Sequence, residues 1–219
     1  MKQGQAITSS TISMPAVLQA KGLCFSYPNH KLFTNFSADI LPGVNLIRGG
    51  DGRGKTTLLR LLAGALPAQA GQLQTNSVCL QDQPLAYRQQ VFWAEPRTDA
   101  FDQVTALAYF ESLRGRYTGF DDSLLTDLIA GLALATHIDK PLYMLSTGSK
   151  RKVWLAAAFA SGAAVTLLDE PFAALDTTSI GFVLELLDDA ADHPARAWLL
   201  ADYEAPDNLR LASLIDLGD

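Results

Sequence analysis

A glycine-rich segment, Gly49–Thr56, constrains the fold of this chain more than any other feature of its sequence. It matches the pattern G-x-x-x-x-G-K-[ST], in which backbone N–H groups surround a phosphate. The apolar run Val44–Arg48 precedes it, and Thr56–Ala63 follows with the spacing of an amphipathic helix. A strand, a glycine loop and a helix in this order predict an α/β fold with a phosphate-binding loop.

The residue types of this segment suit a nucleotide, because glycines let N–H groups converge and the following helix N-terminus adds a favourable dipole. Lys55 can reach the β- and γ-phosphates, and the Thr56 hydroxyl can bind Mg²⁺. A glycine-rich turn without a ligand is the alternative, but a chance match is on the order of 1% in a chain of this size. The predicted nucleotide-binding residues are Gly49, Gly50, Asp51, Gly52, Arg53, Gly54, Lys55, Thr56 and Thr57. For Arg53, a solvent-facing side chain is the alternative.

Composition bounds the size and the partners of the protein. The 219 residues are 48% hydrophobic, which is enough for one α/β domain with a sizeable core. The net charge of −6 and the pI near 5.0 leave no broad basic surface, so nucleic acid is not an expected partner. Cys24 and Cys79 stand far apart without companion ligands, so we expect neither a disulfide framework nor a zinc site, as in a reducing compartment.

The chain shows neither a secretory signal nor a membrane span. Residues 1–15 are polar, lack an apolar stretch and are expected to form a disordered tail before one domain over 16–219. The longest uncharged run, Val153–Leu168, is shorter than the about 20 apolar residues of a span and contains a Ser161-Gly162 break. We therefore expect a soluble domain that acts at a membrane only through another chain. Little sequence follows Tyr203, which leaves no expected room for a regulatory domain.

The pattern beyond the phosphate loop predicts strands and helices that alternate at both ends of the chain, with a helical insert between them. The region Asp102–Ala158 has helical character, and Asp121-Asp122-Ser123 predicts an N-cap for the apolar repeat that follows. We expect a helical subdomain over about 96–160. The other predicted elements are strands over 17–27, 32–40, 165–168 and 197–200, a weak β-rich region over 71–93, and helices over 150–160 and 178–190.

An apolar run that ends in two acids, Val165–Glu170, is the second chemical feature. An acid pair at a strand end is usually part of a solvated loop. Here it follows a phosphate loop, so Asp169 could hold Mg²⁺ through water and Glu170 could act as the general base for the attacking water.

The run Leu145–Ser149, which reads L-S-T-G-S, begins a predicted helix shortly before this strand. In isolation it would be an ordinary Ser/Gly helix start. Together with the phosphate loop, the acid pair and Leu175-Asp176, it resembles the ABC ATPase family, whose signature loop reads L-S-G-G-Q. The resemblance covers roughly residues 17–205. It implies an α/β fold, namely a RecA-like P-loop NTPase core with an N-terminal antiparallel β subdomain and a helical insert subdomain, and it implies ATP and Mg²⁺ as cofactors.

The resemblance also implies roles for single residues. In this family a second ABC domain completes a head-to-tail sandwich, so Ser146 and Gly148 would contact the γ-phosphate held by the partner domain. Asp176 would lie at the dimer interface. Tyr27 stands where the family places an aromatic ring that stacks on adenine, with a core tyrosine as the alternative.

The sequence departs from the family pattern at three places. Glu95 replaces a Gln that touches Mg²⁺ and the attacking water; a carboxylate can still bind Mg²⁺ but adds negative charge. Tyr203 stands at the position of the switch His, where a phenol donates one hydrogen bond but carries no positive charge. Thr147 and Ser149 alter the signature loop. Because one lost transition-state donor costs about 10²-fold or more, we expect ATP binding with slow hydrolysis.

The leading interpretation is an ATP-driven motor subunit that powers a separate transmembrane permease from the cytoplasmic face of the inner membrane. The likeness extends to compact exporter-type subunits, including haem exporters of cytochrome c maturation. The alternative is a degenerate subunit that binds ATP mainly as a dimerisation switch beside a more active partner. A kinase, or an ABC protein that acts on DNA or ribosomes, fits less well, because the signature run is present and paired cassettes or long coiled-coil inserts are absent.

Contact with the permease is expected at the helical insert, over about 96–143. A groove near Glu95, Arg97, Phe101 and Tyr109 is the candidate surface. The histidines are expected to be ordinary structural or surface side chains: His30, His137 and His193.

Overall fold

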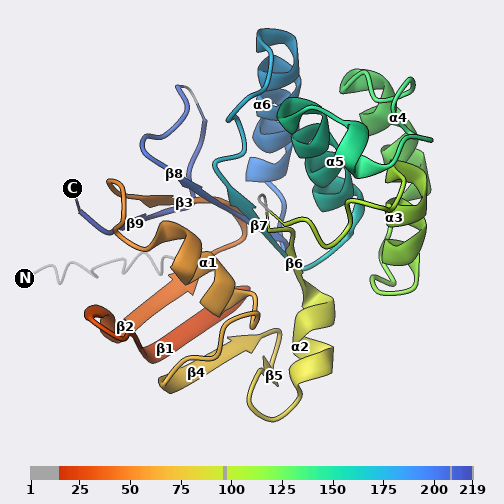
Figure 1. The fold of residues 1–219 in the computed structure, drawn as a ribbon. Helices are drawn as coiled ribbons and strands as arrows, with labels where there is room; N and C mark the ends of the chain where they lie inside the picture. The colour runs from red at the N-terminus through yellow and green to blue at the C-terminus, as the bar shows by residue number, and fades with distance from the viewer. Residues whose placement is uncertain (1–14, 96–97, 208, 219) are drawn as a thin grey trace, which may run out of the picture.

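The phosphate loop lies at the carboxyl ends of the strands of a five-stranded parallel sheet. The computed structural model describes residues 15–95, 98–207 and 209–218. The sheet has the order β6-β7-β8-β3-β9, so strands far apart in the sequence lie side by side (Figure 1). The strands are β3 (Gly43–Arg48), β6 (Val91–Trp93), β7 (Val165–Asp169), β8 (Ala197–Asp202) and β9 (Ser213–Asp216). Strands β3, β7 and β8 are buried along almost their whole length, as expected for parallel strands covered on both faces.

A second, antiparallel sheet is built from the N-terminal part of the chain. Its order is β2-β1-β4-β5, and helix α1 (Lys55–Leu62) lies between it and the parallel sheet (Figure 1). Burial alternates along β1, and the buried residues share one core with the apolar face of α1. The strands are β1 (Leu18–Tyr27), β2 (His30–Ile40), β4 (Ala70–Thr75) and β5 (Val78–Cys79).

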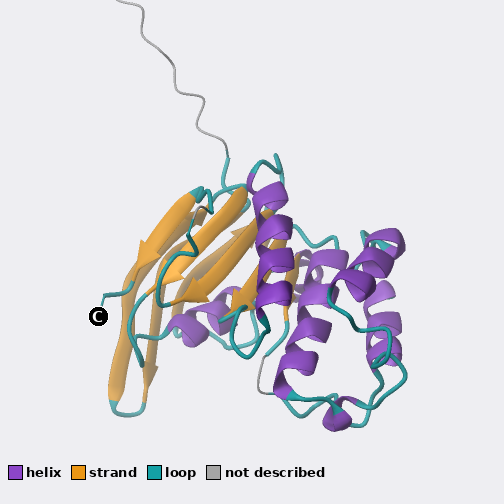
Figure 2. Cartoon of the chain, turned by 90° about the horizontal axis from the view of Figure 1, so that it is seen from above, coloured by secondary structure: helices purple, strands orange, loops and turns teal. Residues whose placement is uncertain are grey.

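Most of the helices lie across the parallel sheet from the antiparallel sheet (Figure 1), and Figure 2 shows them gathered beside the strands. They are α3 (Ala106–Arg114), α4 (Asp122–Gly131), α5 (Thr147–Ala160) and α6 (Thr177–Ala191), with a short 3₁₀ turn at Leu142–Met144. The predicted N-cap of α4 is confirmed, because the Asp121 side chain accepts a hydrogen bond from the Leu124 N–H at 2.9 Å. The fold class predicted from the sequence is therefore confirmed.

The structure corrects the prediction for residues 71–93, which is not β-rich throughout. Helix α2 (Pro84–Gln90) lies there, with Pro84 in its first turn and Tyr87 fully buried. A short helix with one buried side chain has no repeated apolar face, so periodicity could not indicate it. Helix α5 also begins at Thr147, earlier than the predicted 150. Residues 1–14 of the predicted tail and residues 96–97 of the predicted subdomain lie outside the described residues.

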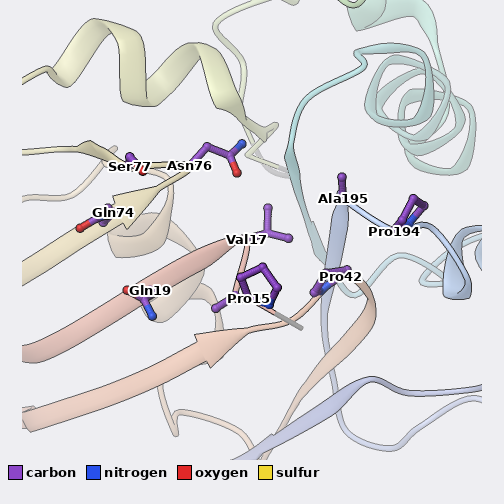
Figure 3. A pocket seen from close by; sticks show the side chains of 10 residues that line it. Pro15, Val17, Gln19, Pro42, Gln74, Asn76, Ser77, Pro194 and Ala195 are labelled. Carbon is purple, nitrogen blue, oxygen red and sulfur yellow. The ribbon is translucent and has the colours of Figure 1, made fainter. Parts of the chain in front are cut away.

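A pocket of about 420 Å³ opens near the amino ends of β3 and β8 (Figure 3), whereas the phosphate loop follows the carboxyl end of β3. Pro42 and Ala195, just before β3 and β8, form part of its wall, while Gln74 and Asn76 come from the antiparallel sheet. Its lining carries no charged side chain. None of the described helices is long and apolar enough to cross a membrane.

Candidate functional site

The phosphate loop takes the conformation that its glycines allow. Gly54, directly before α1, has φ +95°, and a Cβ there would lie 2.7 Å from a methyl carbon of Leu32. The loop lines a hollow of about 310 Å³ together with Tyr27, His30 and Glu170. Arg53 is exposed, as the solvent-facing alternative for it requires.

Lys55 lies folded back over its own loop and is only 7% exposed. Its Nζ donates hydrogen bonds to the carbonyl oxygens of Gly49 at 2.6 Å and Gly50 at 3.1 Å. The ammonium also lies 4.1 Å from the centroid of the Tyr203 ring, which is cation–π geometry. The positive charge is thus held at the mouth of the loop, where phosphate oxygens can replace these carbonyl groups.

Thr56 and Asp169 come together as the sequence predicted for a metal site. The Thr56 hydroxyl donates to Oδ2 of Asp169 at 2.7 Å. Oδ1 of the same carboxylate is buried and has no hydrogen-bond partner among the described residues. Burial raises the pKa of Asp169, and the bond from Thr56 opposes part of that effect. A hydroxyl beside a buried, unsatisfied carboxylate oxygen fits Mg²⁺, which prefers oxygen ligands.

Glu170 lines the hollow with a backbone that few residues adopt. Its φ is +45°, in the left-handed region, and its N–H donates to the Ala201 carbonyl at 2.9 Å. Burial raises the pKa of Asp202, and the nearby charge of Glu170 raises it further. The ends of β7 and β8 therefore place three carboxylates beside the phosphate loop, with Lys55 as a nearby cation.

Tyr203 spans from the end of β8 to the phosphate loop. Its hydroxyl donates a hydrogen bond to Oδ1 of Asp51, and its side chain is 46% exposed. That bond, followed by desolvation and nearby carboxylates, raises the pKa of Tyr203 to about 12. The phenol therefore stays protonated near pH 7 and serves as a donor.

Tyr27 lies at the hollow and not in the core, so the core alternative for it is wrong. It is 42% exposed, and its hydroxyl lies 3.2 Å from Oγ1 of Thr57. His30 and Leu32 also line the hollow, although no sequence motif indicates a role for either residue there. The available signal was the hairpin: β1 and β2 pair Tyr27 with His30, so residues after the turn return to the same place.

Glu95 does not line the hollow. Its carboxylate is exposed and lies 3.9 Å from Nε of Arg60 on α1. The predicted permease groove is corrected at Tyr109, which is 4% exposed and packs edge-on against Phe101 and Trp154. A side chain buried in that cluster cannot form an open groove, and Arg97 lies outside the described residues.

The signature residues lie at the start of α5, away from the hollow of their own chain. Ser146 caps the helix by accepting a hydrogen bond from the Ser149 N–H at 3.1 Å. A Cβ on Gly148 would lie 2.4 Å from the Ala174 carbonyl oxygen, so a glycine is required by packing within the chain. Asp176 caps α6 and forms an ion pair with Lys152 at 2.7 Å, and this bond holds the pKa of Asp176 well below its usual range.

Comparison with known proteins agrees with this geometry. The family model described as ABC transporter matches residues 33–173. The cytochrome c biogenesis ATP-binding export protein CcmA of Pseudomonas savastanoi pv. phaseolicola is 33% identical over 77% of this chain and 80% of its own length. The protein of that name from Escherichia coli K12 is 33% identical over 75% of this chain and 78% of its own length.

Solved structures show the same fold. The ATP binding subunit of an ABC transporter superposes with a TM-score of 0.76 at 21% identity, covering 86% of this chain and 80% of that one. CbiO1 of Clostridium perfringens, described as part of the ABC transporter complex CbiONQ, superposes with a TM-score of 0.64 at 18% identity. The match covers 87% of this chain and 79% of that one. With the family model covering well over half of it, the chain belongs to the ABC transporter family, as an ATP-binding subunit with ATPase activity and a likeness to compact exporter subunits.

Proposed function

We propose that this chain is the motor of an exporter whose membrane permease is a separate chain. The observation that carries the proposal is the junction of Thr56 and Asp169 at 2.7 Å, with Glu170 and Lys55 lining one hollow. These groups are what hydrolysis of a bound nucleotide requires: a metal site, a base and a phosphate-binding cation. The relatives named as ATP-binding export proteins support the direction of transport.

Each group has a proposed role when ATP binds. Lys55 exchanges the Gly49 and Gly50 carbonyl groups for the β- and γ-phosphate oxygens. Thr56 and Asp169 would hold Mg²⁺, which neutralises charge on the phosphates. The Glu170 carboxylate accepts a proton from the attacking water. Tyr27, exposed beside Thr57, stacks on the adenine.

A second ABC domain completes the site in the proposed assembly. Ser146 and Gly148 are exposed or half-buried at the start of α5 and do not line their own hollow. In a head-to-tail dimer they reach the γ-phosphate held by the partner, and the N-terminus of α5 favours that negative charge. Asp176 lies in the same interface.

The chain is proposed to act on the cytoplasmic face of the membrane, held there by its permease. The relatives named as export proteins support an action at a membrane. The comparisons give no support to the alternative that the chain binds ATP only as a dimerisation switch.

Steady-state ATPase assays of the wild type, Lys55→Ala and Glu170→Gln test the proposal. The wild type is expected to turn over, Lys55→Ala to lose ATP binding, and Glu170→Gln to bind ATP but lose at least about 10²-fold in kcat. Equilibrium binding of a fluorescent ATP analogue separates the two variants. A wild type as inert as Glu170→Gln, both alone and with the membrane protein that co-purifies with it, would disprove the motor function.

A further inference from the structure

Arg151, in the second turn of α5, reaches the end of β7. Its Nη1 donates hydrogen bonds to the carbonyl oxygens of Asp169 at 2.8 Å and Glu170 at 2.6 Å. The side chain is half-buried, so water competes only weakly for these bonds. A charged donor on two successive carbonyl groups fixes the two peptide planes that flank Glu170. The first of these peptides joins the proposed metal ligand, Asp169, to the proposed base.

The backbone of Glu170 needs such support. A φ of +45° is unfavourable for a residue with a side chain and persists only where the surroundings hold it. On one side, the Glu170 N–H donates to the Ala201 carbonyl at 2.9 Å. On the other, its carbonyl accepts from Arg151 and from the Ala173 N–H at 3.1 Å. Arg151 is the side-chain contribution to this arrangement.

The start of α5 contacts the same loop at two further points. Gly148 lies so close to Ala174, which also has a left-handed φ of +60°, that a Cβ would meet its carbonyl oxygen at 2.4 Å. Lys152 pairs with Asp176 at 2.7 Å. One turn of α5 therefore sets the path of the chain from Glu170 to Asp176.

We propose that Arg151 is a positioning residue for hydrolysis. It fixes the main chain of Glu170, so that α5 orients the catalytic base of its own subunit. The inference rests on the proposed role of Glu170. Arg151 itself does not line the nucleotide hollow, so it acts on the rate and not on the affinity for ATP. Arg151 thereby connects two parts of the proposed assembly. One is α5, whose N-terminus reaches the ATP held by the partner, and the other is Glu170, the base that acts on the ATP of its own subunit.

Arg196 offers a matched control. It is also half-buried, and its Nε donates to the carbonyl of Ala163 at 2.9 Å, just before β7 begins. Arg196→Gln therefore removes an arginine–carbonyl bond from the opposite end of the same strand. It should lower the melting temperature as Arg151→Gln does, while leaving kcat unchanged.

The test compares Arg151→Gln, Arg151→Lys and Arg196→Gln for kcat, KM, binding of a fluorescent ATP analogue and melting temperature. Misplacement of a reacting group by about 1 Å costs up to about 10²-fold, so Arg151→Gln should lower kcat by about 10- to 100-fold with unchanged ATP affinity. Arg151→Lys should recover part of the rate, because its ammonium can still donate to one carbonyl. If Arg151→Gln fails to fold, Arg151→Lys alone should show a lowered kcat at unchanged affinity.

Three results would overturn the inference: an unchanged kcat in Arg151→Gln, a loss shared equally with Arg196→Gln, or a loss that appears in KM and ATP affinity alone. Glu170→Gln, measured alongside, separates this failure from failure of the proposed function. If Glu170→Gln is inactive while the Arg151 variants keep the wild-type rate, only the positioning role falls. If Glu170→Gln keeps the wild-type rate, the proposed role of Glu170 as the base is wrong.

Discussion

The hydroxyl of Tyr203 donates a hydrogen bond to the carboxylate of Asp51, which joins the end of β8 to the middle of the phosphate loop. The same ring lies 4.1 Å from Nζ of Lys55, so one aromatic side chain contacts both Asp51 and the lysine of the loop. The substitution that distinguishes this chain from its family thus has a structural consequence of its own.

Replacing Tyr203 tests that consequence. We expect Tyr203→His to raise kcat by about 10-fold or more, because an imidazole provides the transition-state donor that the phenol directs to Asp51. Tyr203→Phe keeps the ring beside Lys55 and should leave ATP affinity nearly unchanged. ATPase rates between pH 5.5 and 8.5 provide the measurement, since only the His variant should gain a new titration near pH 6.5. A His variant no faster than wild type would contradict this account.

Glu95→Gln restores the family's residue and should change little. The carboxylate faces Arg60 at 3.9 Å, and an exposed pair at that distance contributes at most about 1 kcal/mol. The Mg²⁺ concentration for half-maximal ATPase activity should therefore match that of the wild type. Asp169→Asn is the comparison, because its carboxylate bonds Thr56 and should be needed for the metal. If both changes raised the Mg²⁺ requirement equally, Glu95 would belong to the metal site after all.

Asp176 should make the stability of the chain depend on pH. Its pKa is lowered by the bond to Lys152 and by the capping bonds from Ser179, so the ionised form is favoured in the folded chain. The unfolded value is about 3.9, so the stabilisation is present above that pH and is lost as pH falls through the folded pKa. Urea unfolding should show Asp176→Asn less stable than wild type near pH 7, with the gap closing in acid. Asp127→Asn, an exposed site on α4, should show no such gap.

Tyr87→Phe should destabilise the chain without affecting the site. The Tyr87 hydroxyl is fully buried and donates to the Leu62 carbonyl at the end of α1, at 2.7 Å. Removing the donor leaves a buried acceptor unsatisfied, which costs about 1–3 kcal/mol. Tyr143 is 55% exposed, so Tyr143→Phe should stay within about 0.5 kcal/mol. Equal effects of the two changes on urea unfolding would refute the role of the buried bond.

The features predicted correctly from the sequence are those whose signal is local. The loop Gly49–Thr56 needs glycines for its own backbone, and Val165–Glu170 combines an apolar strand with acids at its end. Each of these two features can be recognised from a run of consecutive residues. By contrast, α2 is too short to show a period, and β9 resembles a polar coil because only every second residue is partly buried.

Contacts within the site escaped prediction because they join distant segments. Tyr203 and Asp51 are separated by 152 positions, and nothing near either residue indicates the other. Arg151 lies in a Lys-Arg-Lys run that alone suggests a solvated helix face. Only the packing of α5 against the end of β7 shows that its guanidinium holds two carbonyl groups.

Strand β3, which carries the phosphate loop, has a consequence for how the protein is made. Its neighbours in the sheet are β8 and β9, and the Gly50 N–H bonds the Gly218 carbonyl at 3.0 Å. A chain still on the ribosome has released β3 long before either neighbour exists. Its hydrogen-bonding edges stay open through most of synthesis, and long-range pairing of this kind folds slowly. Until β8 and β9 emerge, that exposed edge is a place where a chaperone can protect the growing chain.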